Sequence, residues 1–332
     1  MNNLLSDRIN NLATSQTLAM AALARELKAQ GKDIISLSLG EPDFNTPDFI
    51  KEAAKKAIDE NYSTYSPVDG YGDLKEAICR KFKRDNGLDY KPSQIVVSTG
   101  AKQSLYNIAQ VMLNDGDEVI LPAPYWVSYF EIVKLSGGVP VEVPTSVETD
   151  FKITPEQLEA AITPKTKMMW FSSPCNPSGS VYNREELTAI AKVLEKYPNI
   201  IVVADEIYEH INFSGTFCSI GSIPGMLEKT VTVNGLAKAF AMTGYRIGYI
   251  GAPEFIAKAC TKIQGQVTSG ANSVAQRAAI TAVDADPSVL NHMVQAFHSR
   301  RDLVVGLLKE IPGIKINVPE GAFYVFPDVS SF

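Results

Sequence analysis

The chain has 332 residues, a formal net charge of −6, and ordinary shares of hydrophobic (45%) and charged (20%) residues. No basic block stands out, which argues against nucleic acid as a partner, and no stretch is long and apolar enough to span a bilayer. At this length two domains are expected, and without an apolar run behind basic residues at the N-terminus a cytoplasmic location is expected by default.

Short β-rich runs alternate with helical stretches, which predicts an α/β fold with a mostly parallel central sheet flanked by helices. A first helix is expected over residues 18–30, ended by Gly31, and another over residues 102–113 after the turn at Gly100. A last helix is predicted over residues 286–308, followed by apolar runs at 314–318 and 322–325. Strands are predicted over residues 95–98, 118–121, 139–143, 168–171, 200–203, 230–233 and 247–250.

These elements predict a large domain over residues 46–284. A smaller α/β domain is expected from residues 1–45 and 285–332 together. Polar or glycine residues that could serve chemistry follow several of the strands. Ligands of open α/β sheets bind beyond the carboxyl ends of the strands, so these residues are expected to share one site. They are Gly100, Asn176, Asp205 and Lys238.

Lys238 is the one charged residue in a run of small and apolar residues, and Arg246 follows eight positions later. An exposed lysine amine is almost fully protonated at neutral pH and is no nucleophile, but desolvation lowers its pKa. Desolvated lysines form Schiff bases with carbonyls, and a forked guanidinium suits a phosphate. An aldehyde carrying a phosphate, pyridoxal 5′-phosphate, would satisfy both residues. The alternative is a lysine that extends from an element end into water.

Asp205 follows a wholly apolar strand, so its carboxylate is expected where a buried strand emerges and needs a cationic partner. A protonated pyridine nitrogen would be such a partner, and Tyr208 could reach a phenolic oxygen on the same ring. Asp205 could instead cap a following helix. A metal site formed by Asp205, Glu206, Glu209 and His210 is a further alternative, although the spacing matches no standard motif and no metal is expected. Four widely separated cysteines suggest neither zinc nor disulfides.

Four glycine or proline turns offer further ligand contacts. Residues 98–104 pass from a strand through small residues into a helix, which leaves backbone N–H groups free for an anion. Asn176 precedes a proline, which restricts its backbone to extended geometry and so fixes the direction of its side-chain amide. Trp126 offers a flat indole face, and the turn at Gly40 could let backbone approach a ligand.

Together these segments resemble the class I/II aminotransferases, which are pyridoxal-phosphate enzymes of fold type I, and most closely the bacterial aspartate aminotransferase branch. The resemblance runs from about Leu12 to the last residue. It implies a Schiff-base lysine, a pyridinium aspartate, a tyrosine and an asparagine at the cofactor's phenolic oxygen, a stacking aromatic, and a phosphate site. The matching residues are Lys238, Asp205, Tyr208, Asn176, Trp126, and, for the phosphate, Gly100, Ala101, Lys102 and Arg246.

The resemblance also implies a homodimer with shared active sites, because Tyr65 matches a tyrosine that reaches the phosphate bound by the neighbouring subunit. Substrate contacts are implied at Gly40, whose backbone would meet a carboxylate, and at Trp126 and Asn176. Lys102 matches a lysine that recognises the distal carboxylate of acidic substrates, although a phosphate contact or an exposed helix-start lysine is the alternative.

Ser15 and Thr17 match a segment that lies over the substrate side chain. The implied activity is ping-pong amino transfer from an L-amino acid, with aspartate expected, to a 2-oxo acid, with 2-oxoglutarate expected. Lys238, Asp205 and Tyr208 are the expected catalytic residues. Other fold type I activities remain open at this point: a lyase or decarboxylase, an aromatic or alanine aminotransferase, or a catalytically impaired cofactor-binding homologue.

Two departures from the family pattern stand out. Hydroxyl residues often precede the family's lysine, whereas this chain has residues 235–237 of sequence Gly-Leu-Ala, so one phosphate contact is expected to be missing. The family's arginine for the substrate α-carboxylate lies beyond a run that matches Gly321–Val325, and the sequence stops at Phe332. We therefore expect either a fragment or a homologue without this carboxylate clamp.

Overall fold

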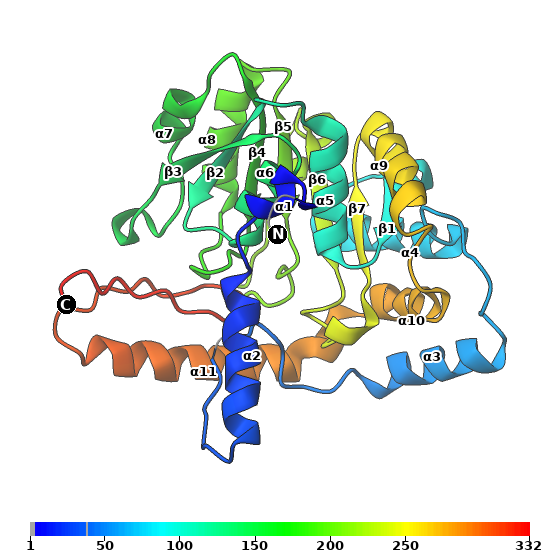
Figure 1. Cartoon of the computed structure of the whole chain (residues 1–332), viewed down its shortest axis with the longest axis horizontal. Coiled ribbons are helices and arrows are strands. Elements are labelled where there is room, and N and C mark those ends of the chain that lie inside the picture. The colour runs from blue at the N-terminus through cyan, green and yellow to red at the C-terminus, as the bar shows by residue number, and fades with distance from the viewer. Residues whose placement is uncertain (1–3, 38) are drawn as a thin grey trace.

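The computed structural model describes residues 4–37 and 39–332, and a twisted sheet lies at the centre of this part of the chain (Figure 1). Its strand order is β1-β7-β6-β5-β4-β2-β3. Strand β7 runs antiparallel to both of its neighbours, while the other pairings are parallel. The strands are β1 (Ile95–Ser98), β2 (Glu118–Ala123), β3 (Val139–Pro144), β4 (Thr166–Ser172), β5 (Ile201–Asp205), β6 (Thr230–Gly235) and β7 (Gly248–Gly251).

Every predicted strand is therefore present, with ends that differ from the expected ones by at most two residues. Helices cover both faces of the sheet (Figure 1). The helices are α1 (Asp7–Asn10), α2 (Gln16–Ala29), α3 (Asp48–Asp59), α4 (Gly72–Lys81), α5 (Ala101–Met112), α6 (Ser128–Leu135), α7 (Pro155–Ala161), α8 (Arg184–Glu195), α9 (Glu254–Val267), α10 (Ser273–Asp284) and α11 (Asn291–Lys309).

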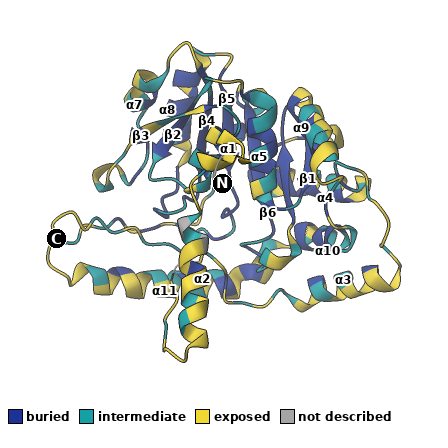
Figure 2. Cartoon of the chain, viewed as in Figure 1, coloured by how far each residue is buried: buried dark blue, intermediate teal, exposed yellow. Residues whose placement is uncertain are grey.

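Alternation along the strands divides the core into layers. On β4, Met168 and Trp170 pack with α5, α6 and α9, whereas Met169 and Phe171 pack with α7 and α8. Successive strand residues point to opposite faces, and apolar residues at every position indicate a sheet that is buried on both faces. Figure 2 shows the sheet as the most buried part of the molecule.

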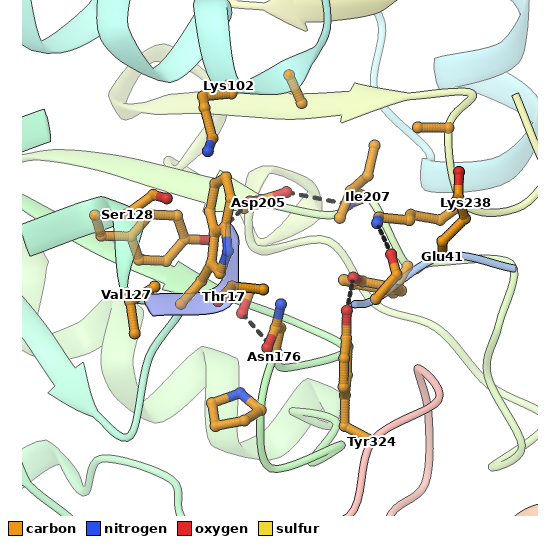
Figure 3. Close-up of a pocket in the computed structure, with 18 of the residues that line it drawn as sticks. Thr17, Glu41, Lys102, Val127, Ser128, Asn176, Asp205, Ile207, Lys238 and Tyr324 are labelled. Atoms are coloured by element: carbon orange, nitrogen blue, oxygen red, sulfur yellow. Dashed lines mark hydrogen bonds between the residues drawn. The ribbon is translucent and has the colours of Figure 1, made fainter. Parts of the chain in front are cut away.

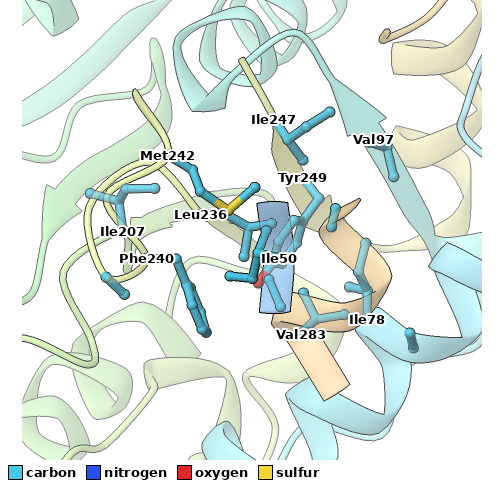
Figure 4. Close-up of a cluster of buried hydrophobic side chains, with 14 of the residues drawn as sticks. Ile50, Ile78, Val97, Ile207, Leu236, Phe240, Met242, Ile247, Tyr249 and Val283 are labelled. Carbon is cyan, nitrogen blue, oxygen red and sulfur yellow. The ribbon is translucent and has the colours of Figure 1, made fainter. Parts of the chain in front are cut away.

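A third apolar cluster lies beside β1 and β7 and includes residues from α3, α4 and α10. Figure 4 shows Ile50, Ile78, Tyr249 and Val283 in this cluster together with Leu236, which lies two residues before Lys238. The chain on either side of the pocket lysine is therefore fixed by the core, because Leu236, Ala239 and Phe240 are all buried in the cluster.

The C-terminal part departs from a simple reading of its apolar runs. The last helix, predicted over residues 286–308, is present, but its first turn is a 3₁₀ helix, Pro287–Leu290, and α11 follows directly. The runs at 314–318 and 322–325 contain no strand. The first makes only the isolated bridge Lys315–Asp328, and the bridge Asn212–Gly321 lies just before the second. The final segment runs back above α11 toward the sheet (Figure 1). Among the residues described, none of the helices is both long and apolar enough to cross a membrane.

Candidate active site

A cavity of about 560 Å³ lies at the carboxyl ends of the parallel strands, where the chain leaves β4, β5 and β6 (Figure 3). Every site residue predicted from the sequence, except Tyr65, lines this cavity. The lining residues that were predicted are Ser15, Thr17, Gly40, Gly100, Ala101, Lys102, Trp126, Asn176, Asp205, Tyr208, Lys238 and Arg246. The packing of parallel strands explains this gathering, because their carboxyl ends share one edge.

Lys238 lies in the turn after β6, and its ammonium nitrogen points into the cavity and donates a hydrogen bond to the backbone oxygen of Gly40 (Figure 3). The rings of Tyr208 and Phe323 lie with their centroids 5.8 Å from this nitrogen. Burial lowers the pKa of Lys238 to about 8, against the opposing charges of Glu41 and Asp205. The alternative of a lysine extended into bulk water is therefore wrong.

Asp205 is the last residue of β5 and is buried, with 5% of its surface exposed. Its carboxylate accepts hydrogen bonds from the Tyr129 hydroxyl at 2.7 Å and from the backbone N–H of Ile207 at 3.3 Å. Burial nevertheless raises its pKa, and the charge of Lys238 is one of the opposing influences. The chain turns after Asp205 without forming a helix, so the helix-cap alternative is wrong.

The metal-site alternative is also wrong, because its members face two different places. Asp205 lines the large cavity, whereas Glu206 and Glu209 point away from it and accept hydrogen bonds from the Asn86 amide at 2.9 and 2.6 Å. Lys81 forms a buried ion pair with Glu209 in the same cluster. Burial raises the pKa of Glu206 to about 8, so this carboxyl is largely protonated at neutral pH.

The start of α5 and Arg246 form a positively polarised end of the cavity. Gly100 has a positive φ of 84°, and a Cβ at this position would overlap the Arg246 guanidinium. The glycine therefore lets the guanidinium approach the first N–H groups of the helix, an arrangement that favours an anion. The guanidinium is held by a 2.8 Å hydrogen bond from Nη1 to the Thr243 backbone oxygen.

Lys102, in the first turn of α5, and Trp126 lie together in the cavity lining. The Lys102 ammonium is 4.7 Å from the centroid of the indole ring. Burial, followed by the nearby charge of Arg246, lowers the pKa of Lys102. A cation held over an aromatic face and facing a cavity is suited to an anionic group on a ligand.

Sequence reasoning missed two tyrosines at this site. Tyr129 donates to Asp205, and the Tyr324 hydroxyl lies 2.5 Å from that of Tyr208. Nothing in the local pattern singles out Tyr129, which lies inside a helix and looks like a core residue. Tyr324 lies in the run Gly321–Val325, which matches the family pattern and was used only to locate the family's carboxylate-binding arginine. The match of this run to the family pattern could therefore have drawn attention to Tyr324.

Tyr65 is the predicted residue that the single chain does not bring to the cavity. It is 94% exposed and lines a separate surface groove formed by residues 63–66 and 268–273. Its role therefore stays a prediction.

Comparisons with known proteins identify the family. The model of the aminotransferases of class I and II matches residues 32–331. The chain is 51% identical to the aspartate/prephenate aminotransferase of Cereibacter sphaeroides and covers 82% of that protein with 98% of its own length. It is 48% identical to the aspartate aminotransferase of Bacillus subtilis, of which it covers 83%, again with 98% of its own length.

Solved structures give the same result. The structure of Thermus thermophilus aspartate aminotransferase with maleate superimposes with a TM-score of 0.95 at 43% identity, over 98% of this chain and 85% of the other. That of Rhizobium meliloti aspartate aminotransferase gives a TM-score of 0.94 at 43% identity, over 97% and 81%. The chain belongs to the class I and II aminotransferases. It is an enzyme of fold type I that depends on pyridoxal phosphate.

The cavity residues fit this cofactor. A buried carboxyl with a raised pKa, Asp205, suits a cationic ring nitrogen. The first N–H groups of α5 beside the Arg246 guanidinium, whose close approach Gly100 permits, suit a phosphate. Lys238 provides an amine whose lowered pKa favours reaction with an aldehyde. These groups line one cavity of suitable size for a cofactor and a small substrate.

Proposed function

We propose that this chain transfers the amino group between aspartate and 2-oxoglutarate. The observation that carries the proposal is the pairing of a desolvated lysine amine, Lys238, with a buried carboxyl, Asp205, in one cavity. The names of the relatives at 46–51% identity support aspartate as the amino donor.

Pyridoxal phosphate, when bound, supplies an aldehyde that captures amines and a ring that accepts the electrons left by Cα deprotonation. Lys238 would hold the cofactor, and its free amine would remove the proton from the substrate Cα. Asp205 would keep the proton on the ring nitrogen, and the Tyr129 hydroxyl, which donates to the Asp205 carboxylate, would orient it.

We propose the remaining cofactor contacts among the residues that line the cavity. Gly100, Ala101 and Arg246 would bind the phosphate, and Trp126 would cover the ring. Tyr208 and Asn176 would hold the phenolic oxygen. The N–H groups at the start of α5 and the guanidinium are fixed before binding, so little ordering is needed to bind the phosphate.

Substrate recognition depends on Lys102, which lies over the indole of Trp126 and can bind a second carboxylate. Ser15, Thr17 and Asn176 line the same cavity, and the backbone oxygen of Gly40 accepts the hydrogen bond from Lys238. The Thermus structure named with maleate, a four-carbon dicarboxylate, supports a pocket of this type for acidic substrates.

The test is a coupled measurement on the purified protein supplied with pyridoxal phosphate. Aspartate and 2-oxoglutarate are expected to yield glutamate and oxaloacetate, and Lys238→Ala is expected to abolish turnover. Lys102→Met should weaken catalysis with aspartate much more than with an uncharged amino acid. Release of carbon dioxide or ammonia without glutamate would instead show a decarboxylase or lyase, and cofactor binding without any turnover would show an impaired homologue.

Prephenate is a second amino acceptor to test, because the Cereibacter relative is named for both substrates. Prephenate is also an oxo acid with a second carboxylate, so Lys102 could serve both acceptors. Formation of the aminated product from prephenate and aspartate would establish this activity.

We also propose a homodimer in which Tyr65 reaches the phosphate of the neighbouring site. The 94% exposure of Tyr65 supports a partner at its surface, and Ile35 and Leu37 are further apolar side chains that the single chain leaves exposed. Light scattering should give twice the chain mass. Mixing Lys238→Ala subunits with Tyr65→Ala subunits should restore activity, because a hybrid dimer with cross-subunit contacts contains one unaltered site.

The domain division is proposed on contacts between the two ends of the chain. Arg300 forms a 2.8 Å ion pair with Asp43, and the ring of Phe44 packs edge-on against Phe297 at 5.4 Å. These contacts support one small domain from residues 1–45 and 285–332 beside a cofactor domain of residues 46–284. A cytoplasmic location is likewise proposed, supported by four cysteines that are all free.

A further inference from the structure

Tyr324 comes from the segment after α11, yet its hydroxyl reaches the cavity (Figure 3). There it lies 2.5 Å from the hydroxyl of Tyr208, and either oxygen can be the donor. The two rings meet edge to face with centroids 5.7 Å apart. The ring of the neighbouring Phe323 packs edge-on against Tyr208 at 5.4 Å, so the contact is supported on two sides.

The pair of hydroxyls presents one proton to the cavity. Two neutral phenols carry two protons, and one of these lies in the bond between the oxygens. Burial raises the pKa of Tyr324 to about 12 and that of Tyr208 well above 10, so both remain neutral at physiological pH. If Tyr324 donates to Tyr208, the proton of Tyr208 is free for an acceptor in the cavity. If Tyr208 donates to Tyr324, the proton of Tyr208 is used in that bond and cannot be donated to a group in the cavity.

Tyr324 also contacts the N-terminal segment. A Cβ at Gly40 would overlap the Tyr324 hydroxyl and lie 3.0 Å from its Cζ atom. Gly40 in turn accepts the hydrogen bond from Lys238. The Tyr324 hydroxyl therefore contacts both Gly40, which accepts the hydrogen bond from Lys238, and Tyr208, which is expected to contact the cofactor.

We propose that Tyr324 is a positioning residue that donates to Tyr208, so that Tyr208 directs its proton to the phenolic oxygen of the cofactor. The inference rests on the proposed function of the cavity. A donor bound to the Tyr208 oxygen polarises its O–H bond and strengthens the outgoing hydrogen bond. The glycine at position 40 is required because any side chain there would displace the Tyr324 hydroxyl.

Tyr324→Phe removes the hydroxyl and keeps the ring. We expect the affinity for pyridoxal phosphate, measured by fluorescence titration, to fall about 3-fold to 10-fold, as for loss of one hydrogen bond. Charge on the phenolic oxygen should also be less stabilised, so the pKa read from the absorbance of the bound cofactor should rise. Tyr90→Phe is the matched control. It also removes a buried tyrosine hydroxyl, which is hydrogen-bonded to the Thr232 hydroxyl at 3.1 Å and does not line the cavity. It should leave both readouts unchanged.

A double-mutant cycle tests the contact with Gly40. Gly40→Ala should weaken cofactor binding in the unaltered protein and weaken it less in the Tyr324→Phe background, where the overlapping hydroxyl is gone. If the unaltered protein binds no pyridoxal phosphate, the proposed function fails and this inference fails with it. If the unaltered protein binds and Tyr324→Phe matches it in affinity and in pH titration, the inference alone is overturned. Additive effects in the cycle would overturn the contact with Gly40.

Discussion

The lowered pKa of Lys238 predicts a specific pH dependence for capture of the cofactor. With a pKa of about 8 in place of 10.5, about one tenth of the amine is deprotonated at pH 7, against about 0.03% for an ordinary lysine. Only the deprotonated amine reacts, so Lys238 should react about 300-fold faster at pH 7 than a lysine of equal intrinsic reactivity. Between pH 7 and 9 its rate should rise about 10-fold and then level off, whereas an ordinary lysine should gain about 100-fold.

The measurement uses cofactor-free protein mixed with pyridoxal phosphate at pH 7 to 10, quenched at short times with borohydride, and mapped by peptide mass. A phosphate monoester has its second pKa near 6, so the charge of the reagent's phosphate is nearly constant across this range. Lys55 and Lys196 are internal references, because both are fully exposed and their ion pairs with Glu52 and Glu159 raise their pKa. A Lys238 rate that climbs in parallel with these two lysines up to pH 10 would refute the reasoning.

Three further predictions follow from the same geometry. Asp205→Ala should lower turnover about 10²–10⁴-fold, as for removal of one member of a buried ion pair, in single-turnover kinetics with aspartate. Gly100→Ala should weaken cofactor affinity, because its Cβ overlaps Arg246, whereas Gly116→Ala has the same positive φ and open space around it and should leave affinity unchanged. Glu206 has a folded-state pKa of about 8, raised from 4.5, so the folded state keeps a proton that the unfolded state loses. The free energy of unfolding should therefore fall as pH rises from about 4.5 to 8, and chemical denaturation of Glu206→Gln should show a weaker fall.

The sheet could be predicted from sequence because its strands are buried on both faces. A run such as residues 200–203 is apolar at every position, which distinguishes it from the amphipathic helices on either side. The C-terminal runs at 314–318 and 322–325 contain apolar residues too, but the first makes one isolated bridge and the second makes none. A strand needs a neighbour with free backbone groups, and a single run does not reveal whether a neighbour is present.

The gathering of site residues was predictable for the same topological reason. Asp205 ends β5 and Lys238 follows β6, and these neighbouring strands are parallel, so the approach of the two residues follows from strand order alone. Tyr129 and Tyr324 were not predictable in this way. Tyr129 belongs to α6, and Tyr324 belongs to a segment without regular structure. Both reach the cavity through tertiary packing, which the residues next to them in the sequence do not predict.

The sequence alone could not decide which of two neighbouring carboxyls, Asp205 or Glu206, faces the ligand. The same apolar strand precedes both, and either could have been the residue that faces the ligand. At the end of a buried strand the two side chains diverge, so Asp205 enters the cavity and Glu206 enters the cluster of Asn86, Lys81 and Glu209. Burial raises the pKa of both, and both accept hydrogen bonds from the protein, but Glu206 lies in a buried cluster with Lys81 and Glu209, whereas Asp205 faces the cavity. That difference in what the two carboxyls face, rather than in burial, makes Asp205 the carboxyl suited to hold a proton on a bound ring.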